Sequence, residues 1–157
     1  MKIEHYERLT KQAIALLENE QNLIANLANL SALLNMELEN INWVGFYLLQ
    51  GNELILGPFQ GKPACVRIPV GQGVCGTAIV KNKGLRIDDV HQFDGHIACD
   101  SASNSEIVIP FQIGGNIAGV LDIDSPQLSR FGEIDEQGLT FLMSEVEKLL
   151  NSHAIST

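Results

Sequence analysis

The chain has 157 residues, of which 10 are Lys or Arg and 19 are Asp or Glu, so its net charge is −9 at neutral pH. This acidic balance argues against binding to nucleic acid or to an anionic membrane surface, because both need a basic face. Hydrophobic residues make up 45% of the chain, which is enough to bury a core. No apolar run approaches the ~18 residues of a membrane span, and the first residues are too polar for a signal peptide. We therefore expect a single cytoplasmic domain over residues 1–157.

The N-terminal part of the chain predicts two helices followed by a hairpin. Apolar residues recur at helical spacing over residues 6–17 and again over 23–38. Residues 41–50 are rich in aromatic and other strand-forming residues. A Gly51-Asn52 turn joins this first strand to a second one over 53–59.

Short elements follow in the middle of the chain. We expect a strand over 66–69, a helix over 74–81 and a strand over 85–88. Residues 91–104 then form a polar loop. A loop of that length inside a compact domain usually has a function.

The last third of the chain predicts a hairpin and a terminal helix. Residues 105–113 and 116–124 alternate as two strands, and apolar residues share one face of a helix over 134–149. Hairpins combined with terminal helices indicate an α+β fold. In such a fold, the N- and C-terminal helices pack on one face of a central antiparallel sheet.

The hydrophobic pattern of the last hairpin predicts its register. Two sets of alternating residues belong on the core face: Ile107, Ile109, Phe111 and Ile113 on the first strand, and Ile117, Gly119, Leu121 and Ile123 on the second. A slip of one residue would turn one set outward. Pairing Ile113 with Ile117 keeps both sets inward and leaves Gly114-Gly115-Asn116 as a three-residue loop.

Three carboxylates share the opposite face of this hairpin. The same register places Glu106 opposite Asp124, with Asp122 beside them, and like charges directly opposite each other destabilise a sheet. One interpretation is an ordinary solvated surface. If the long loop covers this face instead, the carboxylates repel, and at least one of them holds a proton at a raised pKa. Such a cluster can bind an ammonium group and supply a proton.

Trp43 and Tyr47 share one face of the first strand, because side chains alternate with period two. Aromatic residues in a strand usually belong to the core. Here Val44, Phe46 and Leu48 already provide an apolar face. We therefore interpret the aromatic pair as a candidate pocket wall beside the carboxylates.

Three cysteines, Cys65, Cys75 and Cys99, carry the other candidate chemistry. A structural disulfide is not expected in a reducing cytoplasm, so they would matter as thiols or as a redox pair. Cys75 lies near the start of a short helix, where the dipole and the free N–H groups favour a thiolate. Taken singly, each cysteine is more often a small buried hydrophobe than a nucleophile.

The residues alone leave two other cysteine sites open. A zinc site would combine cysteines with His91 and His96, but the cysteines are spaced by 10 and 24 residues and include no C-x-x-C pair. The other is a protease-like pair of Cys99 and His96. Nothing in the sequence suggests the oxyanion hole that such a pair needs.

Three cysteine-containing segments carry a resemblance to a known family. They are GPFQGKPAC at 57–65, GQGVCGTA at 71–78 and GHIACDSASNSE at 95–106. Together with Trp43, Tyr47, Asp122 and Asp124, they make the chain similar to the free methionine-(R)-sulfoxide reductases, a family with a GAF fold. The resemblance covers nearly the whole chain.

The resemblance implies a thiol-dependent enzyme that converts free L-methionine (R)-sulfoxide to methionine. Cys99 matches the nucleophile, whose thiolate attacks the sulfoxide sulfur and becomes a sulfenic acid. Cys65 is our first choice for the second thiol that condenses with it, and Cys75 is the alternative. Thioredoxin would then reduce the disulfide, and no metal or organic cofactor is needed.

The resemblance also implies roles for the carboxylates and the aromatic pair, with the active-site loop on the sheet face away from the terminal helices. Glu106 and Asp124 are expected to serve the sulfoxide oxygen and Asp122 to bind the α-ammonium. Trp43 and Tyr47 would surround the thioether methyl. The GAF resemblance and the apolar terminal helices suggest a homodimer. The main alternative is a non-enzymatic GAF sensor that binds a small molecule unchanged.

Overall fold

The structure, a computed structural model, describes residues 1–95 and 102–156. Its helices are α1 (Ile3–Leu17), α2 (Leu23–Glu37), α3 (Gly73–Lys81) and α4 (Glu133–Ser156), with a 3₁₀ helix η1 at Val90–Gln92. Its strands are β1 (Trp43–Gln50), β2 (Glu53–Gly61), β3 (Arg67–Pro69), β4 (Leu85–Ile87), β5 (Ser105–Ile113) and β6 (Asn116–Ser125). None of the helices in these described ranges combines the length and the apolar character needed to cross a membrane.

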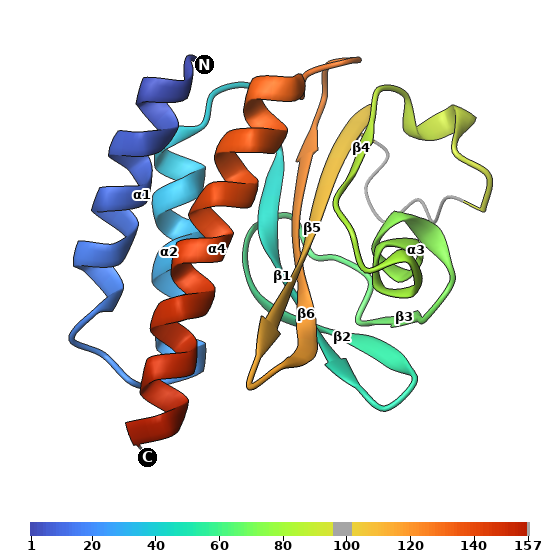
Figure 1. Cartoon of the computed structure of the whole chain (residues 1–157). Helices are drawn as coiled ribbons and strands as arrows, with labels where there is room; N and C mark the ends of the chain where they lie inside the picture. The colour runs from blue at the N-terminus through green and yellow to red at the C-terminus, as the bar shows by residue number, and fades with distance from the viewer. Residues whose placement is uncertain (96–101, 157) are drawn as a thin grey trace.

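The six strands form one antiparallel sheet in the order β3-β2-β1-β6-β5-β4. Helices α2 and α4 pack on one face of this sheet, α1 packs against α2 and α4 on the same side, and the short α3 packs on the other face (Figure 1). This arrangement confirms the predicted α+β fold. Both faces are therefore covered, and each has its own hydrophobic cluster.

The face under α1, α2 and α4 holds the larger cluster. Helix α1 buries one stripe of residues at the predicted helical spacing: Tyr6, Leu9, Ala13 and Leu17. Helix α2 begins after Asn22, whose side chain accepts a hydrogen bond from the Ala25 backbone N–H at 2.9 Å. From α4, Leu139, Leu142 and Val146 are fully buried against the sheet. Amphipathic helices thus seal this face, as their sequence pattern predicts.

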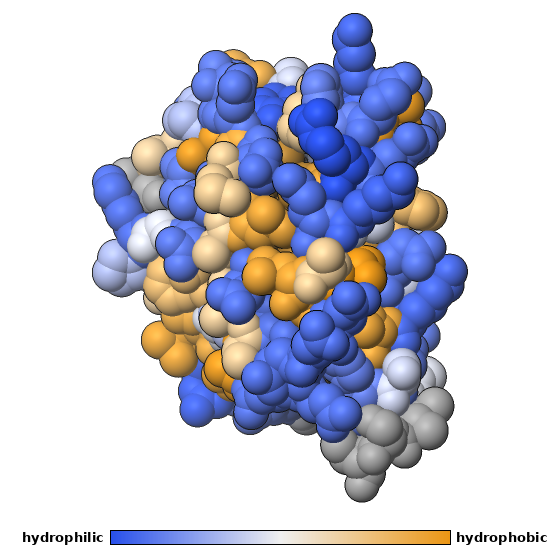
Figure 2. Space-filling view, turned by 90° about the vertical axis from the view of Figure 1, so that its left-hand side faces the viewer, coloured by the Kyte–Doolittle hydropathy of each residue, from blue (hydrophilic) through white to orange (hydrophobic). Residues whose placement is uncertain are grey.

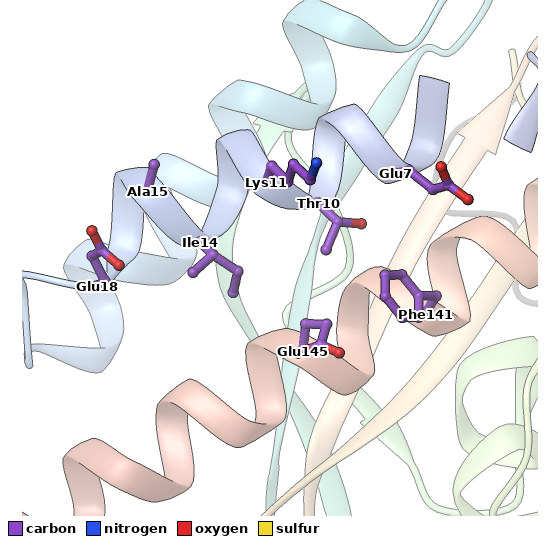
Figure 3. A pocket seen from close by; sticks show the side chains of 8 residues that line it. All are labelled: Glu7, Thr10, Lys11, Ile14, Ala15, Glu18, Phe141 and Glu145. Carbon is purple, nitrogen blue, oxygen red and sulfur yellow. The ribbon is translucent and has the colours of Figure 1, made fainter. Parts of the chain in front are cut away.

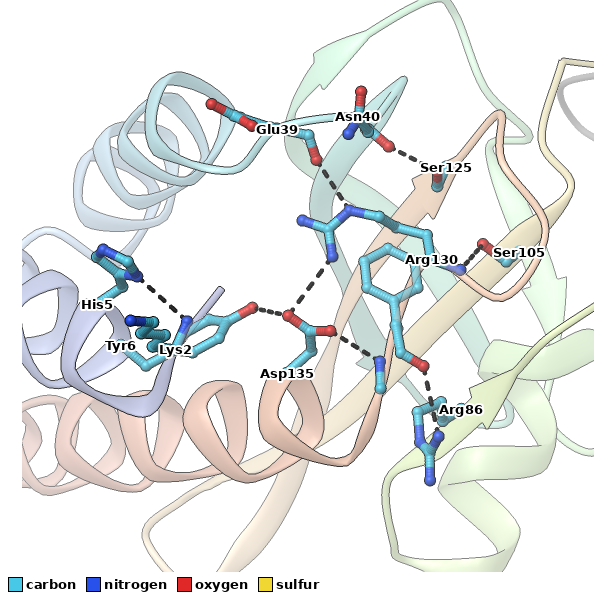
Figure 4. A network of polar contacts seen from close by, with 12 residues as sticks. Lys2, His5, Tyr6, Glu39, Asn40, Arg86, Ser105, Ser125, Arg130 and Asp135 are labelled. Carbon is cyan, nitrogen blue, oxygen red and sulfur yellow. Dashed lines mark hydrogen bonds and ion pairs between the residues drawn. The ribbon is translucent and has the colours of Figure 1, made fainter.

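The first turn of α4 differs from the prediction. Ile134, expected on the core face, is 41% exposed, whereas Asp135 is buried. Asp135 accepts hydrogen bonds from the Tyr6 hydroxyl and the Gly132 backbone N–H, and it lies 3.5 Å from the Arg130 guanidinium (Figure 4). Because this carboxylate occupies the inward position, Ile134 turns outward.

Arg130 extends the same network to the strand that carries Glu106. Its Nε donates to the Glu39 carbonyl at 3.0 Å, and its backbone N–H donates to Ser105 Oγ at 3.3 Å (Figure 4). Satisfied buried polar networks favour one arrangement over its alternatives. The network therefore fixes the start of β5, directly before Glu106.

The tip of the β5–β6 hairpin also differs from the prediction. A bulge beyond Phe111 shifts the register by one residue, so that Ile113 pairs with Asn116 instead of Ile117. The loop shrinks to Gly114-Gly115, whose φ angles of 65° and 82° suit a tight two-residue turn. Ile117 consequently packs with the α3-side cluster and not with the larger core.

Candidate active site

The predicted carboxylate cluster lies on the α3 face of the sheet. Glu106 of β5 pairs with Asp124 of β6, and Asp122 lies two residues before Asp124, on the same face. The exposed fraction is 7% for Glu106 and 5% for Asp122, and Asp124 is half-buried. The interpretation of the cluster as an ordinary solvated surface is therefore wrong.

The environment of Glu106 favours its neutral form. Burial is the main cause that raises its pKa well above the ordinary value, and the negative charges of Asp122 and Asp124 raise it further. Hydrogen bonds with the same two carboxylates act in the same direction. This direction agrees with the expectation that one member of the cluster holds a proton.

Helix α3 places Cys75 over this cluster. Its side chain is 4% exposed, and its Sγ lies within 4.8 Å of one carboxylate oxygen of Glu106 and one of Asp122. Burial raises the pKa of the Cys75 thiol, and the neighbouring carboxylates raise it further. These surroundings favour the neutral thiol over the thiolate expected from the sequence, because burial and negative charge oppose the effect of the helix dipole.

Cys75, Glu106 and Asp122 are also the group of three potential metal donors that the described residues bring together. This group contains no histidine, unlike the zinc site considered from the sequence. His91 is exposed, and its Nδ1 lies 2.9 Å from Asp89 Oδ1. His96, on which the zinc and the protease-like alternatives both depend, lies outside the described residues.

Three aromatic rings form a wall beside the carboxylates. The Trp43 ring stacks on Tyr47 with 5.9 Å between centroids and on Phe59 with 5.1 Å. Trp43 also pairs with Asp124 across β1 and β6, so the wall adjoins the acids directly. Trp43 and Tyr47 belong to the α3-side cluster, as the period-two pattern predicts.

Phe59 is the member of this wall that the sequence did not reveal. It pairs with Gly45 across β1 and β2, and a Cβ at Gly45 would collide with the Phe59 backbone and Cβ. The register of β1 and β2 shifts between Gly45 and Tyr47, which disrupts the period-two pattern. The available signal was a glycine in a strand, since such a residue often marks a close approach by its neighbour.

Two hydrogen bonds connect the aromatic wall to the segment that carries Cys65. The Trp43 indole N–H donates to the Lys62 carbonyl at 3.1 Å, and the Tyr47 hydroxyl donates to the Cys65 carbonyl at 2.8 Å. Burial and the nearby carboxylates raise the pKa of Tyr47, so its hydroxyl remains a donor. The wall thus positions residues 62–65 beside the cluster.

The two cysteines among the described residues differ in oxidation state. Cys65 is disulfide-bonded and half-buried, whereas Cys75 is a free, buried thiol. Cys99, the predicted nucleophile, lies outside the described residues. After that segment, Ser103 Oγ accepts a hydrogen bond from Asn42 Nδ2 at 3.1 Å, which ties the chain to the residue before β1.

The sheet, its covering helices and the enclosed site define a GAF domain protein, and the GAF domain family matches residues 11–150. The chain is 58% identical over 149 residues to the free methionine-R-sulfoxide reductase of Escherichia coli, which is 95% of this chain and 90% of that protein. It therefore belongs to the free methionine-R-sulfoxide reductases, a family of enzymes within the GAF fold.

Solved structures agree with this assignment. The free methionine-R-sulfoxide reductase of Neisseria meningitidis, in complex with its substrate, superposes with a TM-score of 0.92 at 41% identity, over 97% of this chain and 92% of that chain. The fRMsr of Staphylococcus aureus, in complex with substrate, gives a TM-score of 0.88 at 56% identity, over 92% of this chain and 95% of that chain.

Proposed function

We propose that the chain reduces free L-methionine (R)-sulfoxide to methionine. Two thiols supply the electrons: the sulfoxide gains two electrons and two protons, water leaves, and the thiols become a disulfide. The observation that carries the proposal is the buried cluster of Glu106, Asp122 and Asp124 beside the aromatic wall. This arrangement offers negative charge for an ammonium group, a proton for an oxygen atom and an apolar surface for a methyl group.

Substrate binding follows from the two halves of the site. Asp122, buried beside Glu106, would pair with the α-ammonium, and that cation would offset the repulsion among the carboxylates. Trp43 and Tyr47 would hold the thioether methyl against their rings. A methionine sulfoxide within a peptide has lost its ammonium to an amide, so we expect selectivity for the free amino acid.

The first half-reaction would use Cys99 and Glu106. The Cys99 thiolate attacks the sulfoxide sulfur, while neutral Glu106, with Asp124 beside it, gives a proton to the sulfoxide oxygen. The oxygen then moves to the Cys99 sulfur as the substrate S–O bond and the transient bond between Cys99 and the substrate sulfur break, so methionine leaves and Cys99 becomes a sulfenic acid. The raised pKa of Glu106 supports its role as the proton donor.

The second half-reaction would use Cys65 as the resolving thiol. Its thiolate attacks the sulfenic sulfur of Cys99, which releases water and forms the disulfide. Cys65 is favoured over Cys75 because it is half-buried and engaged in a disulfide, whereas Cys75 is a buried free thiol surrounded by carboxylates. We expect Cys65→Ser to release about one methionine per site and then stall. Stalling by Cys75→Ser alone would exchange the two roles.

Thioredoxin is the proposed reductant of this disulfide. A protein dithiol attacks a disulfide sulfur through a mixed disulfide, and the half-buried position of Cys65 leaves a path for that attack. The cytoplasm, the compartment that the sequence predicts, supplies such dithiols. The proposed chemistry needs no metal and no organic cofactor.

A homodimer through α1 and α4 is the proposed assembly. Between these helices lies a groove of about 500 Å³ with Ile14, Ala15 and Phe141 in its lining (Figure 3). Phe141 is 48% exposed and Leu16 is 44% exposed, and apolar residues interrupt the polar surface on this side (Figure 2). Sedimentation of the parent and of Phe141→Glu tests this: a dimeric parent with a monomeric variant supports it, and a monomeric parent contradicts it.

The test of the proposed activity is a balance of products. Incubation with free methionine (R)-sulfoxide and a thioredoxin system should release methionine and consume the reductant in equal amounts. A GAF sensor would bind the sulfoxide and return it unchanged. Recovery of intact sulfoxide, with no reductant consumed, would contradict the proposed function and favour the sensor.

A further inference from the structure

Two fully buried serines, Ser105 and Ser125, lie directly behind the carboxylates. They pair with each other across β5 and β6, one position beyond the pair of Glu106 and Asp124. Because side chains alternate along a strand, the serines point to the face under α1, α2 and α4, away from the acids. The next residues on that face are apolar and belong to the larger cluster. The two hydroxyl groups thus lie at a polar edge of that cluster.

The Ser125 hydroxyl joins the end of β6 to two turns. It donates to the Asn40 carbonyl at 2.5 Å (Figure 4) and accepts from the Gln127 backbone N–H at 3.1 Å. Asn40 has a φ angle of 59°, in the left-handed region, and lies between α2 and β1. The hydrogen bond therefore holds the turn that leads into β1, the strand that carries Trp43 and Tyr47.

The Ser105 hydroxyl ties the start of β5 to the same loop. It donates to the Gln127 carbonyl at 2.6 Å and accepts from the Arg130 backbone N–H at 3.3 Å. Gln127 thus bonds to both serines, to one through its N–H and to the other through its carbonyl. The loop between β6 and α4 therefore holds the ends of both strands together.

The separation of Glu106 and Asp124 depends on how these strand ends are held. The pairing of β5 with β6 ends at the two serines, so the carboxylates lie in the row next to the end of the ladder. Carboxylates enclosed in one place repel each other whenever both are ionised, which favours separation of the strand ends. The serine hydrogen bonds oppose that separation from the opposite face, without occupying the site.

We propose that Ser105 and Ser125 are positioning residues for sulfoxide reduction, whose buried hydroxyl groups fix the ends of β5 and β6 and so hold Glu106 and Asp124 at the spacing needed to deliver a proton to the sulfoxide oxygen. This inference rests on the proposed function and adds residues outside the pocket to it. The serines act through the two carboxylates, since their own side chains lie on the other face of the sheet.

Ser125→Ala and Ser105→Ala test this role, because each removes a hydroxyl and leaves the carboxylates in the chain. The measurement is methionine release in a single turnover, which separates the proton-dependent step from recycling by the reductant. At saturating free sulfoxide we expect the rate constant to fall by about tenfold in each variant, as for a small misplacement of a catalytic group. The half-saturating concentration should stay within about threefold of the parent value.

The pH dependence of kcat/KM adds a readout that a loss of stability alone would not move. The titratable groups that act on Glu106 or are acted on by it are Asp122 and Asp124 of β6, Cys75 of α3 and Tyr47 of β1. Wider spacing weakens the repulsion and admits water, and both effects favour ionised Glu106. The alkaline limb of the profile should therefore move to lower pH by about one unit in both serine variants.

Ile109→Val is the matched control on the same strand. Ile109 lies on the same face of β5 as Ser105, in the larger cluster, and loses one buried methylene in this variant. It should lower the midpoint of urea unfolding and leave the single-turnover rate and the alkaline limb near the parent values. An equal loss of rate in Ile109→Val would mean that the serine variants act by lowering stability, which would overturn the inference.

The remaining outcomes are also decisive. A parent-like single-turnover rate and an unmoved alkaline limb in both serine variants would show that the hydroxyl groups do not position the carboxylates. Should Ser125→Ala not fold, Ser105→Ala decides the question, because it removes the other half of the same connection. A parent that releases no methionine from the sulfoxide would instead refute the proposed function itself.

Discussion

Both faces of the sheet are covered by helices, but they bury different kinds of side chain. Under α1, α2 and α4, Phe46 and Phe111 meet edge to face with 5.8 Å between centroids, in a cluster of apolar residues. Under α3, Glu106 and Asp122 are buried against each other among aromatic rings. Apolar burial stabilises the fold, whereas enclosed like charges oppose it. The comparison indicates that the face under α1, α2 and α4 stabilises the fold. The face under α3 lowers the stability of the fold, because its enclosed like charges form a binding site.

Removal of the proposed nucleophile, Cys99, should have the largest effect on activity. We expect Cys99→Ser to lose measurable turnover, because a hydroxyl at its ordinary pKa cannot replace a thiolate in attack on sulfur. The midpoint of urea unfolding should stay near the parent value. The measurement is methionine release per site over a long incubation. Normal steady-state turnover by this variant would contradict the mechanism.

Replacement of each of the three carboxylates by its amide should have the second largest effect on activity. Glu106→Gln and Asp124→Asn should lower kcat by about a hundredfold, as for loss of a general acid. Asp122→Asn should mainly raise KM. Glu53→Gln is the control, since Glu53 forms an exposed ion pair with Arg67 and should leave activity unchanged. Near-normal activity of all three cluster variants would reduce the cluster to structural charge.

A cavity in the cluster under α1, α2 and α4 should have the opposite effect: it should lower stability and leave activity unchanged. Leu142 is fully buried, so Leu142→Ala should lower the free energy of unfolding by about 2–5 kcal/mol. KM and kcat of the folded protein should remain near the parent values at a temperature well below unfolding. Urea unfolding combined with steady-state kinetics checks this. A large change in KM for this variant would mean that the two faces are not separable.

The smallest predicted effect is a change in how stability depends on pH. Glu106 holds its proton in the folded protein above its ordinary pKa of 4.5, where the unfolded chain releases it. The folded state then binds more protons, so stability falls as pH rises from about 4.5 through the raised pKa. Glu106→Gln removes this contribution, and its unfolding midpoint should fall less steeply with pH. An identical slope in both proteins would place the proton elsewhere.

The parts of the fold that the sequence predicts are those that a regular pattern controls. Helical spacing identifies α1, and alternation places Glu106 opposite Asp124, because both patterns follow from how side chains project. The bulge beyond Phe111 leaves no mark in the alternation on either side of it. The prediction that Ile134 is buried is wrong for a different reason, since its neighbour Asp135 is held inward by partners that include Tyr6, which is distant in the sequence.

The candidate site shows the same limit. Local sequence favours a thiolate at Cys75, since the helix dipole is a local property. The carboxylates that reverse this preference come from β5 and β6, which lie far along the chain. The sequence did not predict Phe59 in the aromatic wall, because its position there depends on the register shift between β1 and β2. Effects that arise from tertiary contacts are thus the ones that the sequence pattern did not reveal.

The most direct test of the account is methionine release from three substrates under one set of conditions: the free (R)-sulfoxide, the free (S)-sulfoxide and the (R)-sulfoxide within a blocked peptide. The account predicts turnover of the free (R)-sulfoxide with equal consumption of thioredoxin dithiol. It predicts little or no turnover of the peptide, which lacks the ammonium that the buried carboxylates require. Equal rates on the free and the peptide-bound (R)-sulfoxide would contradict the claim that this cluster recognises the free amino acid.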